Sequence, residues 1–264
     1  MSLTVAIAGL LMLQTPQAGP KPSELISKSL ARYAAAKTIV GTIKLTQAAA
    51  GQAGTISTTF QLQRPDKLYI RQVQEKVPPR VWLVTCDGKG FTYDLPVETE
   101  GRKPARLYEP MVRETGKLTV QDVYRATVAS IGDRSAPLDI AVGHKEDLRF
   151  ITGQWASLSY AGQSELRGVP CHKIKGLWRE FPGGPIVGRF ELFLDDQSLI
   201  RRYAIEQAIQ VQPNQPPLQV VSVWDVDLKL DADVDPALFR LVRCGWKDHR
   251  CGAEPHSIKA HRVL

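Results

Sequence analysis

The sequence predicts an α+β fold: a curved antiparallel sheet of about ten or eleven strands, with helices covering its concave side. Runs in which apolar and polar residues alternate occur in both halves of the chain, and this period of two indicates a sheet with two different faces. The turns between successive runs leave no room for crossover helices, so the strands should be antiparallel. A sheet of about ten strands tends to curl or close rather than stay flat.

The first predicted element is a helix from Pro22 to Lys37. Pro22 prevents extension backwards, and Ser23 is the expected N-cap. The helix has one apolar face, which must pack on another element and is formed by Leu25, Ile26, Leu30 and Tyr33.

The clearest strands in the chain follow this helix. The alternation predicts strands at 38–46, 55–63, 67–71, 81–85 and 91–93, with a short one at 107–108. Turns are expected at Arg64-Pro65-Asp66, in the loop 76–80 with its two prolines, and at Asp87-Gly88.

Helical patterns then interrupt the strands. Thr119 and Asp122 form a T-x-x-D capping pattern ahead of a helical periodicity that continues to about residue 131. Short helices are expected at 136–141 and 145–150. A second run of strands is predicted at 156–160, 169–178, 187–194, 200–210 and 218–230, and a single helical turn at 235–239 should plug one end of the sheet.

An apolar surface should line the concave side of this sheet. The expected lining residues are Phe60, Leu62, Leu68, Ile70, Leu83, Phe91 and Tyr93 in the first half and Leu192 and Leu194 in the second. A concavity of this kind, plugged by helices, is suited to holding an acyl chain or another hydrophobic ligand. The alternative is that the helices fill it completely as an ordinary core.

No motif for catalysis stands out. The aspartates between 225 and 235 lack the glycine and the final glutamate of a calcium loop. Asp195-Asp196 lies at a predicted hairpin tip, where aspartates are typical turn residues. The chain has no nucleophile elbow, phosphate-binding glycine loop or HExxH motif. We therefore expect a protein that is not an enzyme, with no catalytic residue and no cofactor.

The N-terminal segment reads as a secretory signal peptide. Its apolar run from Val5 to Leu13 is shorter than the roughly 20 residues of a membrane-spanning helix. Small, turn-forming residues follow at 15–19, although no Lys or Arg precedes the run. Residues 1–18 are therefore the expected signal peptide, and the expected location is periplasmic or otherwise exported.

The charge pattern argues against nucleic acid as a partner. The formal net charge is +7, but Lys and Arg are scattered between acidic residues through the body of the chain. No basic stripe interleaved with aromatic residues is present. Only the C-terminal tail, residues 243–264, is locally basic.

Four cysteines in an exported chain permit two disulfides. The preferred pairing joins Cys244 with Cys251 and Cys86 with Cys171, and the other pairings stay open. In the tail, a zinc site competes with the disulfide, because Cys and His side chains are zinc ligands. Its candidate ligands are Cys244, His249, Cys251 and His256. The C-x6-C spacing is wider than in most zinc sites, which favours the disulfide.

Several segments carry a family resemblance. Residues 64–68 (RPDKL), 83–89 (LVTCDGK) and 91–94 (FTYD) resemble the RP and DGK..W.Y segments of the LolA-like superfamily of lipoprotein carriers, which includes LolB- and RseB-like proteins. The second half is most similar to a family of predicted periplasmic proteins within that superfamily. The segments concerned are 160–165 (YAGQSE), 168–172 (GVPCH), 191–195 (ELFLD), 199–202 (LIRR) and 235–239 (DPALF). The resemblance covers residues 23–241; Gly90 displaces the aromatic that follows DGK in the carriers, and the tail after Arg243 matches nothing in the family.

The resemblance implies an unclosed antiparallel half-barrel with helices as a lid, which binds lipid or lipoprotein acyl chains in the concavity. It also implies that Arg64 holds the lid closed, since a guanidinium offers five donors and can hold several carbonyls at once. The alternative for Arg64 is a surface arginine in a turn.

The predicted organisation is thus a signal peptide (1–18), a half-barrel domain (19–242) and a basic tail (243–264). The expected function is non-enzymatic binding of a lipid or other hydrophobic ligand by a monomer, with an envelope or membrane protein as a further possible partner. The alternative function is an envelope stress sensor or protein-binding scaffold with the same fold.

Overall fold

The computed structural model describes residues 19–76, 79–94, 106–113, 116–127, 130–210, 212 and 214–241. The expected signal peptide and the basic tail lie outside the described residues, and so do Cys244, His249, Cys251 and His256.

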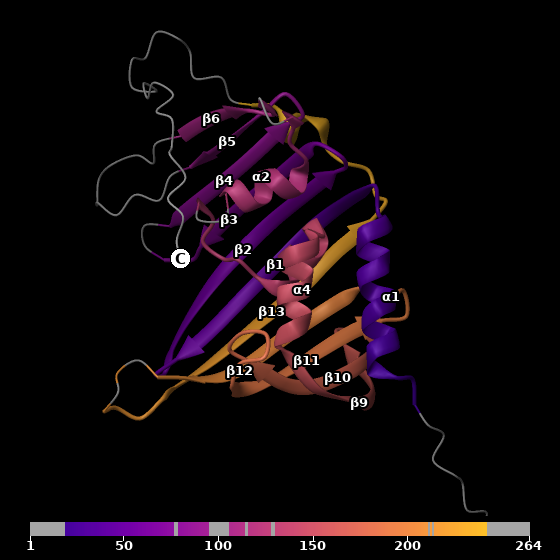
Figure 1. The fold of residues 1–264 in the computed structure, drawn as a ribbon, viewed down its shortest axis with the longest axis vertical. Coiled ribbons are helices and arrows are strands. Elements are labelled where there is room, and N and C mark those ends of the chain that lie inside the picture. The colour runs from indigo at the N-terminus through magenta and orange to yellow at the C-terminus, as the bar shows by residue number, and fades with distance from the viewer. Residues whose placement is uncertain are drawn as a thin grey trace, which may run out of the picture.

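Eleven strands form one antiparallel sheet, which confirms the predicted fold class (Figure 1). In spatial order they are β6 (Arg106–Pro110), β5 (Gly90–Asp94), β4 (Arg80–Asp87), β3 (Lys67–Gln74), β2 (Gln52–Gln63), β1 (Thr38–Ala49), β13 (Leu218–Leu230), β12 (Ile200–Ile209), β11 (Ile186–Asp195), β10 (Val169–Arg179) and β9 (Trp155–Leu166). Because β6 and β9 at the two ends do not pair with each other, the sheet stays open. A separate two-stranded ribbon consists of β7 (Val112–Arg113) and β8 (Gly116–Lys117).

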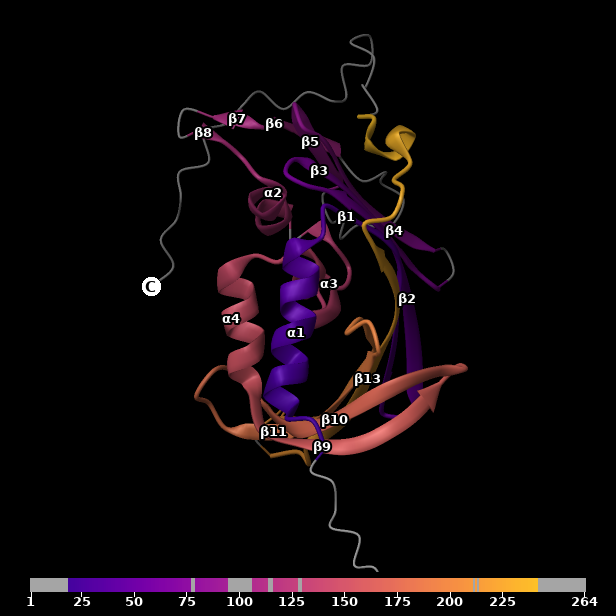
Figure 2. The same cartoon turned by 90° about the vertical axis from the view of Figure 1, so that its right-hand side faces the viewer.

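Four α-helices of the described chain lie on the concave side of the sheet (Figure 2). They are α1 (Pro22–Ala35), α2 (Val120–Thr127), α3 (Ala136–Val142) and α4 (Lys145–Gln154). Helix α3 contacts each of the other three, so the helices form one connected layer. Together with the sheet they enclose a single apolar core.

The capping residues at the helix ends agree with those predicted from the sequence, except at the start of α1. The N-cap of α1 is Lys21, not Ser23, and Pro22 occupies the first helical turn, where its missing N–H costs nothing. Before α2, Thr119 and Asp122 exchange hydrogen bonds as the capping pattern predicts. Helix α3 ends at Gly143, which adopts the left-handed conformation typical of a helix C-cap.

The predicted helical turn after β13 is the 3₁₀ element η2 (Pro236–Phe239), but its position differs from the prediction. It packs on β3 and β4, and the backbone N–H of Asp235 donates to Gln61 of β2 at 2.9 Å. Gln61 alternates with the inward-facing Phe60 and Leu62, so η2 covers the convex face (Figure 2). The sheet end is not plugged by this element.

The two halves of the sheet join where β1 pairs with β13. Gly41 of β1 lies opposite Leu228 and has a φ of 149°. A Cβ atom at this position would lie 1.9 Å from the backbone carbonyl oxygen of Asp227. The close approach of the two strands therefore requires glycine.

We predict that Gly41→Ala destabilises the chain by about 3 kcal/mol, because it adds a backbone clash to an unfavourable φ. Urea denaturation followed by circular dichroism measures this change. Gly54→Ala on β2 is the matched control, since nothing lies within 4 Å of its Cβ position. Equal stability of the two variants would contradict the assignment.

Candidate functional site

The apolar residues predicted to line the concavity lie on the concave face of the sheet, with one exception. Phe60, Leu62, Leu68, Ile70 and Phe91 are fully buried, and Tyr93, Leu192 and Leu194 are at most 8% exposed. Cross-strand pairing aligns them in rows; Leu62, for example, lies opposite Leu68, which lies opposite Cys86. Their burial places them in the hydrophobic core that the sheet and the helices share.

Leu83 is the exception. It pairs with Arg71, whereas its neighbours Trp82 and Val84 pair with Gln72 and Ile70 on the concave face. Because side chains alternate along a strand, Leu83 points to the convex face, where it is half-buried. Trp82 and Val84 take its place in the concave lining.

The second half of the sheet contributes an aromatic cluster that the sequence analysis missed. Tyr203 is its centre, and its ring lies 5.7 Å from that of Trp224 and 5.9 Å from that of Phe190. Trp155 donates its indole N–H to the Tyr203 hydroxyl at 3.0 Å. Trp178 lies edge-on to the same ring. The alternation of aromatics with polar residues in these strands is the signal that could have identified the cluster.

Helices α1, α2 and α3 cover this face. Their buried apolar side chains complete the core: Ile26 and Tyr33 from α1, Val120, Val123 and Tyr124 from α2, and Leu138, Ile140, Ala141 and Val142 from α3. Apart from Leu83, the predicted lining residues therefore belong to the same buried cluster as the apolar side chains of the helices, as expected if the helices fill the concavity as an ordinary core.

Arg64 fastens two of these helices to the end of β2. Its Nε donates to the carbonyl oxygen of Ala36 at 3.0 Å, and Nη2 donates to that of Tyr33 at 3.3 Å, both at the end of α1. At the end of α3, Nη1 donates to Val142 at 3.0 Å and Nη2 to Ala141 at 3.2 Å. One side chain thus satisfies four helix-terminal carbonyls, which have no partner within their own helices.

The local sequence explains this geometry. The backbone N–H of Arg64 donates to the carbonyl of Lys37, which fixes the residue beside the end of α1. Gly143 ends α3, and a Cβ there would lie only 3.4 Å from Nη2 of Arg64. A guanidinium is also favoured here because the C-terminal ends of both helices carry partial negative charge.

Helix α1 has a second attachment to the sheet through Tyr33. Its hydroxyl accepts a hydrogen bond from the backbone N–H of Ile200 at 3.2 Å. Burial raises the pKa of Tyr33 well above its ordinary value, which keeps the hydroxyl neutral.

Cys86 and Cys171 are free and buried, so the predicted disulfide between them is wrong. They lie on β4 and β10, which six other strands separate, β3, β2, β1, β13, β12 and β11. Cys86 instead donates to the carbonyl of Asp66 at 3.0 Å. Burial is the main cause that raises the pKa of the Cys86 thiol to about 11. Sequence spacing could not reveal that the two thiols face different parts of the sheet.

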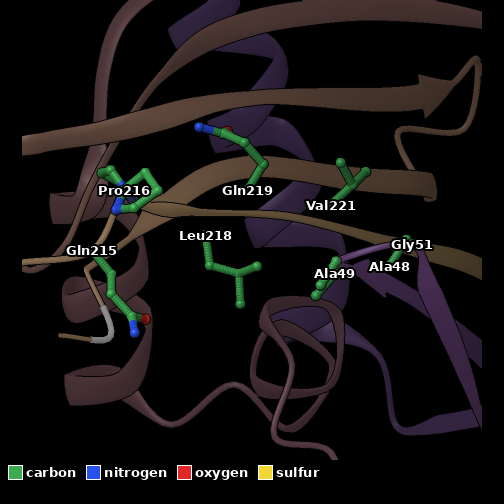
Figure 3. A pocket seen from close by; sticks show the side chains of 10 residues that line it. Ala48, Ala49, Gly51, Gln215, Pro216, Leu218, Gln219 and Val221 are labelled. Atoms are coloured by element: carbon green, nitrogen blue, oxygen red, sulfur yellow. The ribbon is translucent and has the colours of Figure 1, made fainter.

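An open pocket of about 730 Å³ lies at the far ends of β1 and β13 (Figure 3). Its lining residues come from the β1–β2 hairpin and from the loop before β13 and include Ala49, Pro216, Leu218 and Val221. None of the predicted lining residues contributes to it. In the part of the chain that the structure describes, no group of three or more metal-ligating side chains occurs, and no helix is long and apolar enough to span a membrane.

We predict that Arg64→Lys weakens the attachment of α1 and α3 to the sheet by about 2 kcal/mol, because one ammonium cannot reproduce the fork of donors that holds two helix ends. Hydrogen–deuterium exchange of the peptides covering α1 and α3 should increase, with the sheet unchanged. Arg71→Lys is the matched control, since Arg71 is an exposed arginine on the same half of the sheet. Unchanged exchange in the Arg64 variant would contradict a fastening role.

No protein-family model and no curated protein matches the chain. Three of the solved structures that it resembles are the lipoprotein LppX of Mycobacterium tuberculosis, the MucA/MucB complex of Pseudomonas aeruginosa and a LolA superfamily protein of Nitrosomonas europaea. LppX is 8% identical, with 81% of this chain and 99% of that chain covered and a TM-score of 0.41. The MucA/MucB complex is 12% identical, with 83% of this chain and 60% of that chain covered and a TM-score of 0.40. The LolA superfamily protein is 11% identical, with 84% of this chain and 99% of that chain covered and a TM-score of 0.30.

The function proposed below rests on the contacts within the chain itself. The unclosed sheet, the helices on its concave side and the arginine that joins them are the architecture that the sequence motifs implied. The chain is an α+β half-barrel: one open, curved antiparallel sheet with helices on its concave side.

Proposed function

We propose that the chain binds the acyl chain of a lipid or lipoprotein between the concave face of the sheet and its helices, without catalysis. In the structure the helices pack on the concave face, and we call this the closed arrangement. In the ligand-bound arrangement the helices move away from the sheet, and the acyl chain covers the apolar surface that they leave.

The fastening of two helices by Arg64 is the observation that carries this proposal. All four acceptors are neutral backbone carbonyls, and water can replace the guanidinium at each of them once the helices move. No carboxylate is among these acceptors, so opening does not strand a buried charge of opposite sign. Release of the Arg64 hydrogen bonds is therefore one step that opening of the apolar face requires.

The chemistry of the face favours an acyl chain as the ligand. Its first half is aliphatic around Leu62, Leu68 and Ile70, and its second half is aromatic around Tyr203. Contact of either surface with a hydrocarbon chain lowers the free energy, by about 25 cal/mol for each Å² of apolar area removed from water.

A protein-binding scaffold is the second candidate. Strand β9 forms one edge of the sheet, and an extended peptide can add to such an edge. However, the pairing of β9 with β10 shifts register twice, and bulges of this kind hinder the addition of a further strand. The closed apolar face therefore supports the first candidate better.

A brominated acyl chain tests the proposal. Trp82, Trp178 and Trp224 lie on the concave face and are each at most 8% exposed. Bromine quenches tryptophan emission at short range, so 9,10-dibromostearate should quench roughly half of the total emission if it occupies this face. Stearate is the matched control and should leave the emission nearly unchanged. Equal emission with the two fatty acids would overturn the proposal.

Native mass spectrometry of the chain purified from a cell-envelope extract separates the two candidates. A lipid adduct in the gas-phase complex supports the carrier. A bound polypeptide with no lipid adduct supports the scaffold and counts against the carrier.

A further inference from the structure

A further attachment holds the helical layer to the sheet where β2 and β3 carry the paired residues Thr58 and Gln72. The segment between α2 and α3 bends toward the concave face at Gly132 and Asp133. Gly132 lies against the ring of Trp82, and a Cβ there would approach that ring to 2.5 Å. The segment is therefore seated directly on β4.

Gln72 of β3 binds this segment with its whole amide. Its Oε1 accepts from the backbone N–H groups of Gly132 at 2.7 Å and Asp133 at 2.9 Å. Its Nε2 donates to the carbonyl of Asp133 at 2.7 Å and to the Thr58 hydroxyl at 3.1 Å. Gln72 is fully buried, and these four bonds satisfy both donors and both lone pairs of its amide. The hydrogen bonds to Gly132 and Asp133 explain why a polar residue, Gln72, is buried among apolar side chains of the sheet.

The carboxyl group of Asp133 completes the attachment. Its Oδ2 accepts the indole N–H of Trp224 on β13 at 3.1 Å, and the residue is only 7% exposed. Asp133 therefore connects the helical layer to the second half of the sheet, while Gln72 connects it to the first.

The charged groups around Asp133 do not neutralise it. Asp139 of α3 faces it and adds repulsion, and Tyr124 of α2 donates its hydroxyl to Asp139 at 2.6 Å. The neighbouring Arg134 is directed toward Asp139 and toward Asp147 of α4, with Nη2 2.6 Å from Oδ1 of Asp147. Nδ1 of His144, the N-cap of α4, lies 3.4 Å from Oδ2 of Asp147. The hydrogen-bond partners of the segment on β3 and β13 are Gln72 and Trp224, both uncharged.

We propose that residues 132–133 form a second latch, which ionisation of Asp133 releases, so that the helices open as the pH rises and stay closed in acid. The purpose of this opening rests on the proposed binding function. The latch itself depends only on contacts within the chain.

The direction of the pH effect follows from the burial of the carboxyl group. Burial is the main cause that raises the pKa of Asp133 to about 6, repulsion from Asp139 adds to it, and the Trp224 hydrogen bond opposes it. In an opened latch, water would return the pKa toward its ordinary value near 4. The contribution of Asp133 to closure is therefore fully present below about pH 4, falls as the pH rises from about 4 to about 6, and is lost above about pH 6. Arg64 stays charged throughout this range, so its hydrogen bonds to α1 and α3 do not change with pH.

Hydrogen–deuterium exchange of the ligand-free full chain, corrected for the intrinsic pH dependence of exchange, tests the latch. Protection of the peptides spanning 130–143 should fall about tenfold between pH 5 and pH 7.5, since one pH unit below the pKa corresponds to a factor of ten. Asp133→Asn keeps an acceptor for Trp224 but cannot ionise, and its protection should not change with pH. Asp196→Asn, at an exposed hairpin, should behave like the wild type. The same pH profile in wild type and Asp133→Asn would overturn the latch.

Two further variants sharpen the outcome. Trp224→Phe removes the donor to the ionised carboxylate and should move the pH midpoint upward. This shift can be read even if Asp133→Asn fails to fold, and an unmoved midpoint would contradict the role of Asp133. Because histidine also changes charge between about pH 5 and 8, His144→Gln tests the competing explanation. A pH profile that disappears in His144→Gln would assign the switch to His144 and overturn the proposal.

The uncharged dye N-phenylnaphthylamine separates the latch from the binding function. Its dissociation from the wild type should be about tenfold faster at pH 7.5 than at pH 5, and equally fast at both in Asp133→Asn. If the dye does not bind but the exchange profile is as expected, the result contradicts the binding function and supports the latch. If the dye binds but dissociates at the same rate at both pH values, and hydrogen exchange does not change with pH, the result contradicts the latch and supports the binding function.

Discussion

The four hydrogen bonds of Arg64 are the interaction on which the arrangement of the helices depends. Helices α1 and α3 are separated by about a hundred residues of chain, yet both end at one guanidinium. The ends of the two helices would otherwise leave unpaired carbonyls at the border of the core. Their common donor fixes the position of one helix relative to the other and of both relative to β2, and α2 and α4 pack around this fixed pair.

The apolar concave face includes a few buried polar residues whose hydrogen-bonding groups are satisfied. Thr58 and Gln72 are adjacent on β2 and β3, and both are buried among apolar neighbours. Each polar atom there has a partner, so neither residue leaves an unsatisfied group in the core. The polar positions mark where the loop between helices touches the sheet, and the apolar positions mark where the helices themselves lie.

Most of the strands and helices could be predicted from sequence because each depends on local rules. Alternation identified the strands, and capping residues such as Thr119 and Gly143 mark helix ends that lie close to the expected ones. The failures concern relations between distant elements. Leu83 was assigned to the wrong face because an apolar run, Val81 to Val84, does not show which residues face inward. The disulfide between Cys86 and Cys171 failed because strand order, which spacing does not encode, separates them. The Tyr203 cluster combines residues from five strands and was missed for the same reason.

The pairing of β1 with β13 has a consequence for how the chain acquires its structure. Every other neighbouring pair of strands in the sheet is consecutive or nearly so in sequence, so each half can assemble from hairpins. Ile39 and Leu230, which lie opposite each other, belong to nearly opposite ends of the described chain. Forming contacts of such separation closes a very long loop and slows folding. The seam between the halves is therefore the step expected to set the folding rate, and nascent chains that lack β13 would expose the edge of β1.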